Sequence, residues 1–296
     1  MKKILFTLLC LPFFGLGQSI IYSTYTDREL IKTDINGNSP TTLYTSNTNY
    51  IADIFMDNIN NRIYWNERPT SGQASILMRS DINNFNPEQV MNVYSPQMEG
   101  LHIMQDTNLI YWSYDQEIYN NANGYENLVL TYSQLSAFCI DDNDKYIYAN
   151  RWTSGYSLDR YNLDGSNPTY IGSLGDHAYS MAMDENNQRI YYITGSSVRY
   201  FDLNTGIDHL IKGNVSIPSE SKVAIYNSGS STPYIVWTSH YQGYIGKVKS
   251  DGTEFQVVLQ DFNTRGICIA EKTGKLEGFV YMDLDSNGVY DSSTET

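Results

Sequence analysis

The sequence predicts an all-β fold: a six-bladed β-propeller of four-stranded blades. Three observations lead to this prediction. An Ile-Tyr or Ile-Val-Trp phrase recurs six times, about every 40 to 45 residues. Asn-Gly and Asp-Gly pairs, which favour tight hairpin turns, separate the strand-like runs. The first unit lacks its innermost strand, and a matching apolar run stands at the end of the repeats, at 266–269.

The clearest repeat unit extends from Ser180 to Ile211 and holds four short strand-like runs. These runs are 180–184, 189–192, 198–202 and 209–211. The second run of every unit contains the recurring phrase, which begins at Ile21, Ile63, Ile110, Ile147, Ile190 and Ile235. A fixed period with four strands per unit is typical of propeller blades. The third run of the third unit, at 117–124, is the least regular.

The first run of each unit is the most apolar, as expected for the strand beside a central channel. Five copies lie at 54–57, 101–104, 138–141, 181–184 and 223–226, and the sixth is the run at 266–269. We therefore expect N- and C-terminal strands to share one blade and close the ring. Closure removes the open sheet edges that would promote aggregation.

The same arrangement bears on the cysteines of the repeat region. Cys139 belongs to the innermost strand of the fourth blade and Cys268 to that of the first. These blades lie opposite each other in a ring of six, well beyond the roughly 7 Å Cα separation that a disulfide permits. We expect two buried free thiols that act as small apolar fillers.

The N-terminus, 1–17, has the pattern of a signal peptide. Lys2 and Lys3 precede an apolar stretch from Ile4 to Phe14 that is too short to span a membrane as a mature helix. Gly15 and Gly17 place cleavage before Gln18. Leu9 before Cys10 is a poor match to a lipoprotein signal, which needs a small residue there. We therefore expect a secreted or cell-surface protein without membrane insertion.

The net charge of the chain argues against two classes of partner. The formal net charge is -14, and 26 of the 296 residues are Tyr. Nucleic acids and anionic membranes are recognised by basic patches, so an acidic chain of this kind argues against both. A protein or glycan ligand is expected, and the sequence does not indicate the oligomeric state.

The repeats resemble the YWTD propellers of the LDL-receptor class B type. The resemblance rests on the Ile-Tyr-Trp phrases, on the turn from Leu163 to Pro168 and on 265–267, and it covers 19–270. No unit has the full five-residue signature; Tyr64-Trp65-Asn66-Glu67 is among the nearest. The resemblance implies that domain 18–270 is a non-enzymatic binding or adhesion module. Fold alone does not settle function.

A ligand-binding face is predicted on the loops that follow the second strands and on those that join the blades. Exposed aromatic side chains beside Arg are typical of recognition surfaces. The predicted residues are Tyr50, Glu67, Arg68, Tyr114, Asp115, Arg151, Trp152, His177, Tyr179, His240, Tyr241 and Arg265, with Glu220 nearby.

An alternative is a metal-dependent hydrolase of the gluconolactonase type, with a divalent ion in the channel. The acidic residues near the starts of the innermost strands are Asp53, Glu99 and Glu220. The sequence contains no nucleophile elbow, His-Glu-x-x-His, phosphate-binding loop or Cys-x-x-Cys motif. The recurring carboxylates at the ends of those strands are interpreted as turn-stabilising; they are Asp57, Asp141 and Asp184.

The C-terminal stretch, 271–296, departs from the repeat. Its alternating oxygen ligands match loop positions 1, 3, 5 and 9 of a calcium site, with Gly288 at position 6. These ligands are Asp283, Asp285, Asn287 and Asp291. Thr294 stands where a bidentate Glu is usual. The stretch resembles the opening of a repeat-B or Cna-B-like adhesin module, so we expect calcium there; the alternative is a solvated acidic tail.

Overall fold

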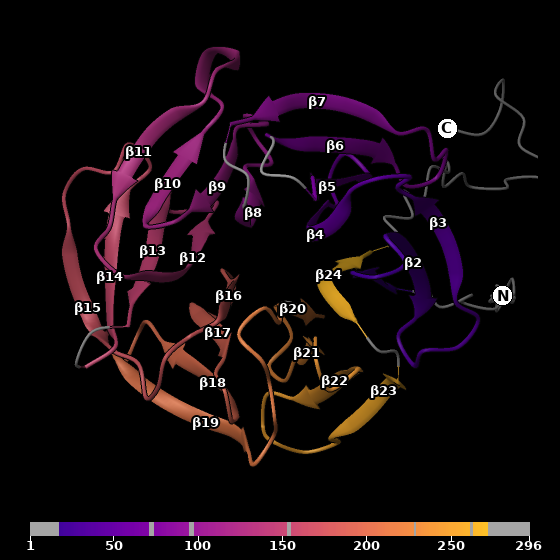
Figure 1. Cartoon of the computed structure of the whole chain (residues 1–296). Helices are drawn as coiled ribbons and strands as arrows, with labels where there is room; N and C mark the ends of the chain where they lie inside the picture. The colour runs from indigo at the N-terminus through magenta and orange to yellow at the C-terminus, as the bar shows by residue number, and fades with distance from the viewer. Residues whose placement is uncertain are drawn as a thin grey trace, which may run out of the picture.

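The computed structural model describes residues 18–70, 74–94, 98–152, 155–227, 229–260 and 263–271. In these residues, six four-stranded antiparallel sheets form a closed ring (Figure 1). This confirms the predicted all-β six-bladed propeller. The predicted signal peptide and the acidic tail after Glu271 lie outside the described residues.

Each blade uses consecutive strands, numbered outward from the channel, except that the last strand completes the first blade. Blade 1 is β24 (Thr264–Ala270), β1 (Ser19–Thr24), β2 (Glu29–Asp34) and β3 (Thr41–Thr45). Blade 2 is β4 (Tyr50–Asp57), β5 (Arg62–Arg68), β6 (Ser75–Asp81) and β7 (Glu88–Val93). Blade 3 is β8 (Glu99–Ile103), β9 (Ile110–Tyr114), β10 (Glu117–Asn120) and β11 (Asn127–Thr131), with the short 3-10 helix η1 (Ala122–Gly124) after β10.

The other three blades repeat the same order. Blade 4 is β12 (Leu135–Asp141), β13 (Tyr146–Arg151), β14 (Ser157–Asn162) and β15 (Thr169–Ser173). Blade 5 is β16 (Ser180–Asp184), β17 (Arg189–Ile193), β18 (Ser197–Asp202) and β19 (Ile207–Gly213). Blade 6 is β20 (Val223–Tyr226), β21 (Tyr234–Ser239), β22 (Tyr244–Lys249) and β23 (Gln256–Gln260).

Ring closure occurs as predicted. β24 pairs antiparallel with β1, in a register that runs from Ser19 opposite Ala270 to Tyr22 opposite Ile267. All seven residues of β24 are buried. The first and last strands of the propeller, β1 and β24, therefore lie side by side and close the ring (Figure 1).

The hydrophobic core is divided among the six interfaces between neighbouring blades. On β17, Ile190 and Tyr192 pack with blade 4, while Tyr191 and Ile193 pack with blade 6. Successive strand residues point to opposite faces, and both faces of each blade are covered. The central residues of this second strand are therefore apolar on both faces, which explains why the Ile-Tyr phrase recurs in the second strands.

The cysteine prediction is confirmed. Cys139 lies on β12 of blade 4 and Cys268 on β24 of blade 1, and both are buried free thiols. Burial raises the pKa of both thiols. Protonated thiols of this kind are poor nucleophiles and behave as small apolar groups.

The carboxylates at the ends of the innermost strands stabilise turns, as predicted. Asp57 accepts a hydrogen bond from the Asn60 backbone N–H at 3.0 Å, and Asp141 accepts one from Asn143 at 3.0 Å. Asp184 is buried and accepts the side-chain amide of Asn187 at 2.8 Å. Each of these carboxylates therefore supports the lower turn of its blade through at least one oxygen.

The turns between third and fourth strands need the glycines that the sequence places there. Gly165 has φ of +80°, and a Cβ on it would lie 2.1 Å from the carbonyl oxygen of Val129 in blade 3. This left-handed conformation strains residues with side chains. The Asp-Gly signal thus marks a hairpin and a close contact between blades.

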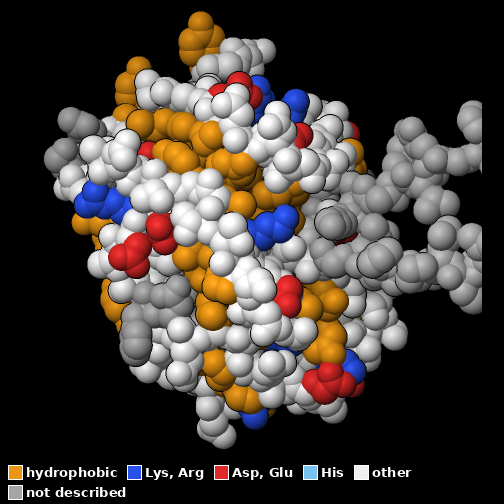
Figure 2. All heavy atoms as spheres, turned by 90° about the vertical axis from the view of Figure 1, so that its right-hand side faces the viewer, with side chains coloured by type: hydrophobic (Ala, Val, Ile, Leu, Met, Phe, Trp, Pro, Cys, Tyr) orange, Lys and Arg blue, Asp and Glu red, His pale blue; other side chains and the backbone are white. Residues whose placement is uncertain are grey.

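Exposed apolar side chains are scattered over the outer wall, among polar and charged ones (Figure 2). Leu210 on β19 and Val257 on β23 are 58% and 41% exposed. Single exposed apolar residues are common on soluble proteins and need no functional explanation. The more distinctive surface is the end of the ring where the innermost strands begin.

Candidate functional site

We call the end of the ring where the innermost strands begin the upper face. All innermost strands start there, and the second strands end there. By this topology, the residues of the predicted ligand-binding face all lie at the upper ends of their blades. They do not all converge on one site.

A pocket of about 210 Å³ opens on the upper face at the mouth of the channel. It brings together five of the predicted residues and Glu220. Its lining is Arg68, Glu99, Leu135, Ser136, Trp152, His177, Tyr179, Ser219, Glu220, Lys222 and Arg265. We call it the upper pocket.

Three buried or nearly buried cations line the upper pocket, and each is held by an acid. The Arg68 Nη2 donates to the carbonyl oxygen of Met98 at 2.7 Å and lies 3.3 Å from Glu99. Arg265 Nη2 lies 2.9 Å from Glu220. Lys222 Nζ, at the start of blade 6, lies 3.2 Å from Asp53 on β4 of blade 2. These pairs fix the cations in place around the mouth.

Two aromatic clusters flank the cations. The Tyr25 cluster consists of Tyr25, Tyr50, His240 and Tyr241. Measured between ring centres, Tyr25 stacks on Tyr50 at 4.2 Å, His240 lies 5.6 Å from Tyr25, and Tyr241 lies 4.4 Å from His240. The Arg265 guanidinium lies 5.1 Å from the centre of the Tyr25 ring. Such a cation-π contact immobilises the arginine.

The Trp152 cluster lies between the upper ends of blades 4 and 5. The His177 ring centre lies 6.2 Å from that of Trp152, 6.4 Å from that of Tyr156, on which it stacks, and 5.1 Å from that of Tyr179, which it meets edge-on. Trp152 is 54% exposed and Tyr241, in the other cluster, is 67% exposed. Large aromatic side chains this exposed can contribute strongly to a protein interface.

The remaining predicted residues lie apart from the upper pocket. Glu67 is buried on β5 of blade 2 and accepts hydrogen bonds from the hydroxyls of two residues at the end of blade 1, Tyr44 at 2.7 Å and Ser46 at 2.9 Å. Burial and then the hydrogen bond to Glu67 raise the pKa of Tyr44 to about 12. Glu67 therefore links blade 2 to blade 1 and is too enclosed to contact a ligand.

Arg151 and the Tyr114 hairpin also lie outside the pocket. Arg151 pairs with Asp159 at 2.6 Å and lies over the Tyr132 ring at 5.0 Å, so it is held within blade 4. Tyr114 is half-buried, and Asp115 is exposed at the turn between β9 and β10. Neither residue of that hairpin lines the upper pocket.

Sequence reasoning missed Lys222 and Tyr25. Lys222 directly precedes innermost strand β20, near the position that Arg265 holds at the start of β24. A basic residue at the start of an innermost strand, as at Arg265, is the signal that could have identified Lys222. Tyr25 follows β1, in the loop class from which the other aromatic residues were chosen.

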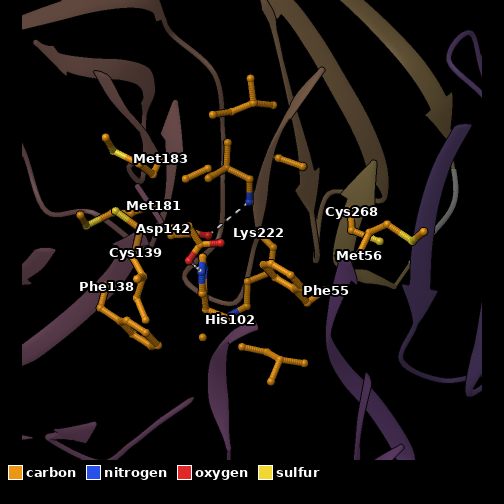
Figure 3. A pocket seen from close by; sticks show the side chains of 18 of the residues that line it. Phe55, Met56, His102, Phe138, Cys139, Asp142, Met181, Met183, Lys222 and Cys268 are labelled. Atoms are coloured by element: carbon orange, nitrogen blue, oxygen red, sulfur yellow. Dashed lines mark hydrogen bonds and ion pairs between the residues drawn. The ribbon is translucent and has the colours of Figure 1, made fainter. Parts of the chain in front are cut away.

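Below the upper pocket, the channel encloses about 870 Å³ (Figure 3). Cys139, Met181 and Met183 line one side, and Met56 and Cys268 lie on the other (Figure 3). His102 from β8 lies 3.0 Å from Asp142, at the lower end of blade 4. Lys222 lines both the channel and the upper pocket.

The acids suggested for a channel metal do not form a ligand set. Asp53 contacts Lys222, Glu99 contacts Arg68, and Glu220 contacts Arg265. Across the part of the chain that the structure describes, no group of three or more His, Cys, Asp or Glu could hold a metal ion. The residues present therefore do not fit a divalent ion in the channel. The predicted calcium ligands Asp283, Asp285, Asn287 and Asp291 lie outside the described residues.

His240 provides a pH-dependent element beside the pocket. It is 3% exposed, and its Nδ1–H donates to the carbonyl oxygen of Thr264 at 3.1 Å. Burial lowers the pKa of His240, an effect that the Arg265 charge reinforces and that the Thr264 hydrogen bond and Glu220 oppose. The folded protein therefore favours a neutral imidazole.

We predict that His240 makes the protein less stable in mild acid. A lowered folded-state pKa adds stability above the unfolded value of about 6.5, and this stability is lost as the pH falls below that value. Thermal melts between pH 7.5 and 5.5 should show a steeper loss for the wild type than for His240→Gln. One proton contributes at most about 1.4 kcal/mol per pH unit. Equal slopes would show that His240 does not protonate on unfolding.

Comparisons with known proteins support the fold. No protein-family model matches the chain, and no curated protein does. Among solved structures, a chain of a nidogen/laminin complex superposes with a TM-score of 0.71 at 12% identity, covering 86% of this chain and 99% of that one. TolB from Acinetobacter baumannii gives 0.69 at 15% identity, covering 86% of this chain and 66% of TolB. At these identities, the likeness establishes the propeller fold alone.

The resemblance to YWTD propellers is therefore supported at the level of fold, and membership of that family stays a prediction. No helix in the described ranges is both long and apolar enough to cross a membrane.

Proposed function

We propose that this chain is an exported, non-enzymatic propeller that binds a protein ligand at its upper face. The observation that supports this proposal most strongly is the upper pocket, whose ion-paired cations lie between two partly exposed aromatic clusters. Aromatic residues and Arg are enriched where protein interfaces carry most of their binding energy. The nidogen/laminin structure is that of a complex, which is consistent with this use of the fold.

The clusters are suited to binding because several of their side chains already pack against neighbours in the free protein. Tyr50 is stacked on Tyr25, and the Arg28 guanidinium lies 5.2 Å from the Tyr50 ring centre. His177 is held between Trp152 and Tyr156 in the same way. Side chains ordered in the free protein lose little conformational entropy on binding, so more of the contact energy contributes to affinity.

The test uses the two most exposed aromatic residues of the clusters. We expect Trp152→Ala combined with Tyr241→Ala to weaken capture of the ligand at least tenfold, since each anchor contributes roughly 1 to 2 kcal/mol. Purified protein would be immobilised and incubated with extracellular proteins of the source culture, and bound proteins quantified by mass spectrometry. A single ligand would then be measured by surface plasmon resonance.

The matched control changes exposed aromatic residues away from the upper face. Tyr170 on the outermost strand β15 is 63% exposed and Tyr125, in the connection between β10 and β11, is 75% exposed, so Tyr125→Ala with Tyr170→Ala removes similar surface. Capture should survive in this control. If the control loses the ligand and the upper-face variant retains it, binding takes place away from the upper face and the proposal is wrong.

A further inference from the structure

The upper pocket is polarised from one side to the other. Its cations come from three consecutive blades: Lys222 from blade 6, Arg265 from blade 1 and Arg68 from blade 2. The opposite wall, from blades 4 and 5, presents Trp152 and Tyr179. A ligand group in the pocket therefore meets positive charge on one side and aromatic surface on the other.

The cations are less hydrated than most of the acids that accompany them. The side chains of Arg265, Arg68 and Lys222 are 5%, 11% and 15% exposed. Glu220 and Glu99 are 36% and 51% exposed, so water screens their charges more strongly. Asp53 is the exception: it is 8% exposed and compensates Lys222. The two arginines therefore give the inner wall of the pocket a positive character.

The ion pairs of the two arginines with Glu99 and Glu220 each involve Nη2 alone. A guanidinium has five N–H donors in a planar fork that matches a carboxylate. The Arg68 Nε–H is buried and has no hydrogen-bond partner among the described residues. Burial, and then the positive charge of Arg265, lowers the pKa of Arg68, although Glu99 and Asp53 partly oppose this shift. An anion beside the two arginines would relieve this repulsion.

The size of the pocket limits what can enter it. At about 210 Å³ it is smaller than the 300 to 1,000 Å³ typical of drug-sized ligand sites. One chain end or one side chain fits better than a folded surface. Lys222 also lines the channel beneath, so a group at the bottom of the pocket still has a cation within reach.

We propose that the upper pocket binds the C-terminal carboxylate of a partner polypeptide, through Arg68, Lys222 and Arg265, with the last side chain against Trp152 and Tyr179. This inference rests on the proposed function and specifies its partner. A chain end supplies a carboxylate and an adjacent side chain in a small volume. It also leaves the rest of the partner free to be neutral or basic, which the net charge of -14 favours over an acid-rich partner.

The experiment compares two peptide libraries that differ only at their ends. Hexapeptides with random last four positions would be made once as free acids and once as C-terminal amides. Both would be passed over the immobilised full chain, and retained peptides identified by mass spectrometry and measured by calorimetry. We expect the selected free acids to bind at least tenfold more tightly than their amides, with aromatic or large apolar residues enriched at the last position.

Two results would overturn the proposal. One is that neither library yields a peptide that binds with Kd below 1 mM. The other is that the amides bind as well as the acids. If the enriched sequences then share an internal Asp or Glu, the pocket binds an acidic side chain instead.

Substitutions then locate the binding. Arg265→Gln should weaken the selected free acids at least tenfold and leave their amides unchanged, and Arg265→Lys should restore part of the loss. Because Arg265 is buried, Arg68→Gln provides a second variant, and thermal melts identify any misfolding. Lys249→Gln removes a cation of β22 that lies 27% exposed beside Glu254 and should change nothing. A protein ligand that needs Trp152 and Tyr241 but not the arginines would refute the chain-end inference and leave the proposed function standing.

Discussion

A chain that ends at Asn263 should fail to form a stable propeller, whereas one that ends at Glu271 should fold. The shorter chain lacks β24, the innermost strand of blade 1. Ile267 and Ile269 pack in the core between blades 1 and 6, and Cys268 packs between blades 1 and 2. Loss of two buried isoleucines alone costs about 4 to 10 kcal/mol. Whole domains have only about 5 to 15 kcal/mol of stability, so the ring should open.

Size-exclusion chromatography and thermal melts followed by circular dichroism would measure this effect. The shorter chain should aggregate or lose its cooperative transition, because β1 becomes an unpaired edge beside two exposed half-cores. A synthetic peptide of residues 264–271 should partly restore the transition. A shorter chain that melts cooperatively within about 3 °C of the longer one, a shift worth less than about 2 kcal/mol, would refute closure as the main source of stability.

The fold could be predicted because each blade needs the same apolar strands. Ile190 and Tyr191 face opposite interfaces, so both must be apolar, and the phrase recurs wherever a second strand does. Closure could be predicted because one unit lacked an innermost strand and the run that contains Cys268 was in excess. Both signals are short patterns of neighbouring residues, and they recur once in each blade.

The site could be predicted only in part, because convergence depends on distance from the channel axis. Arg68 and Arg151 each end the second strand of a blade, but only Arg68 lines the upper pocket. Arg151 is held by Asp159 within its own blade, a contact that strand order alone does not specify. Lys222 was missed because a single lysine before an apolar strand forms no motif.

Trp237→Ala should be among the most destabilising single substitutions in the core. Trp237 is fully buried on β21, in the core between blades 5 and 6, and it stacks on Phe255 at 6.1 Å. Replacing a buried aromatic residue by Ala costs about 3 to 5 kcal/mol, to be measured by urea unfolding. Trp237→Phe should cost about half as much or less, since it keeps a ring and removes a buried indole N–H that has no partner in the described part of the chain.

The residue opposite Trp237 provides a sharper test of this packing. Gly246 pairs with Trp237 across β21 and β22, and a Cβ on Gly246 would lie 2.3 Å from the indole ring. Gly246→Ala should therefore destabilise the wild type by about 1 to 3 kcal/mol through overpacking. In the Trp237→Ala background the ring is gone, and the same substitution should be nearly neutral. A double-mutant cycle should give a coupling of about 1 kcal/mol or more. Additive effects would mean that the indole does not lie over Gly246, and that the cost of Gly246→Ala comes from the strand itself.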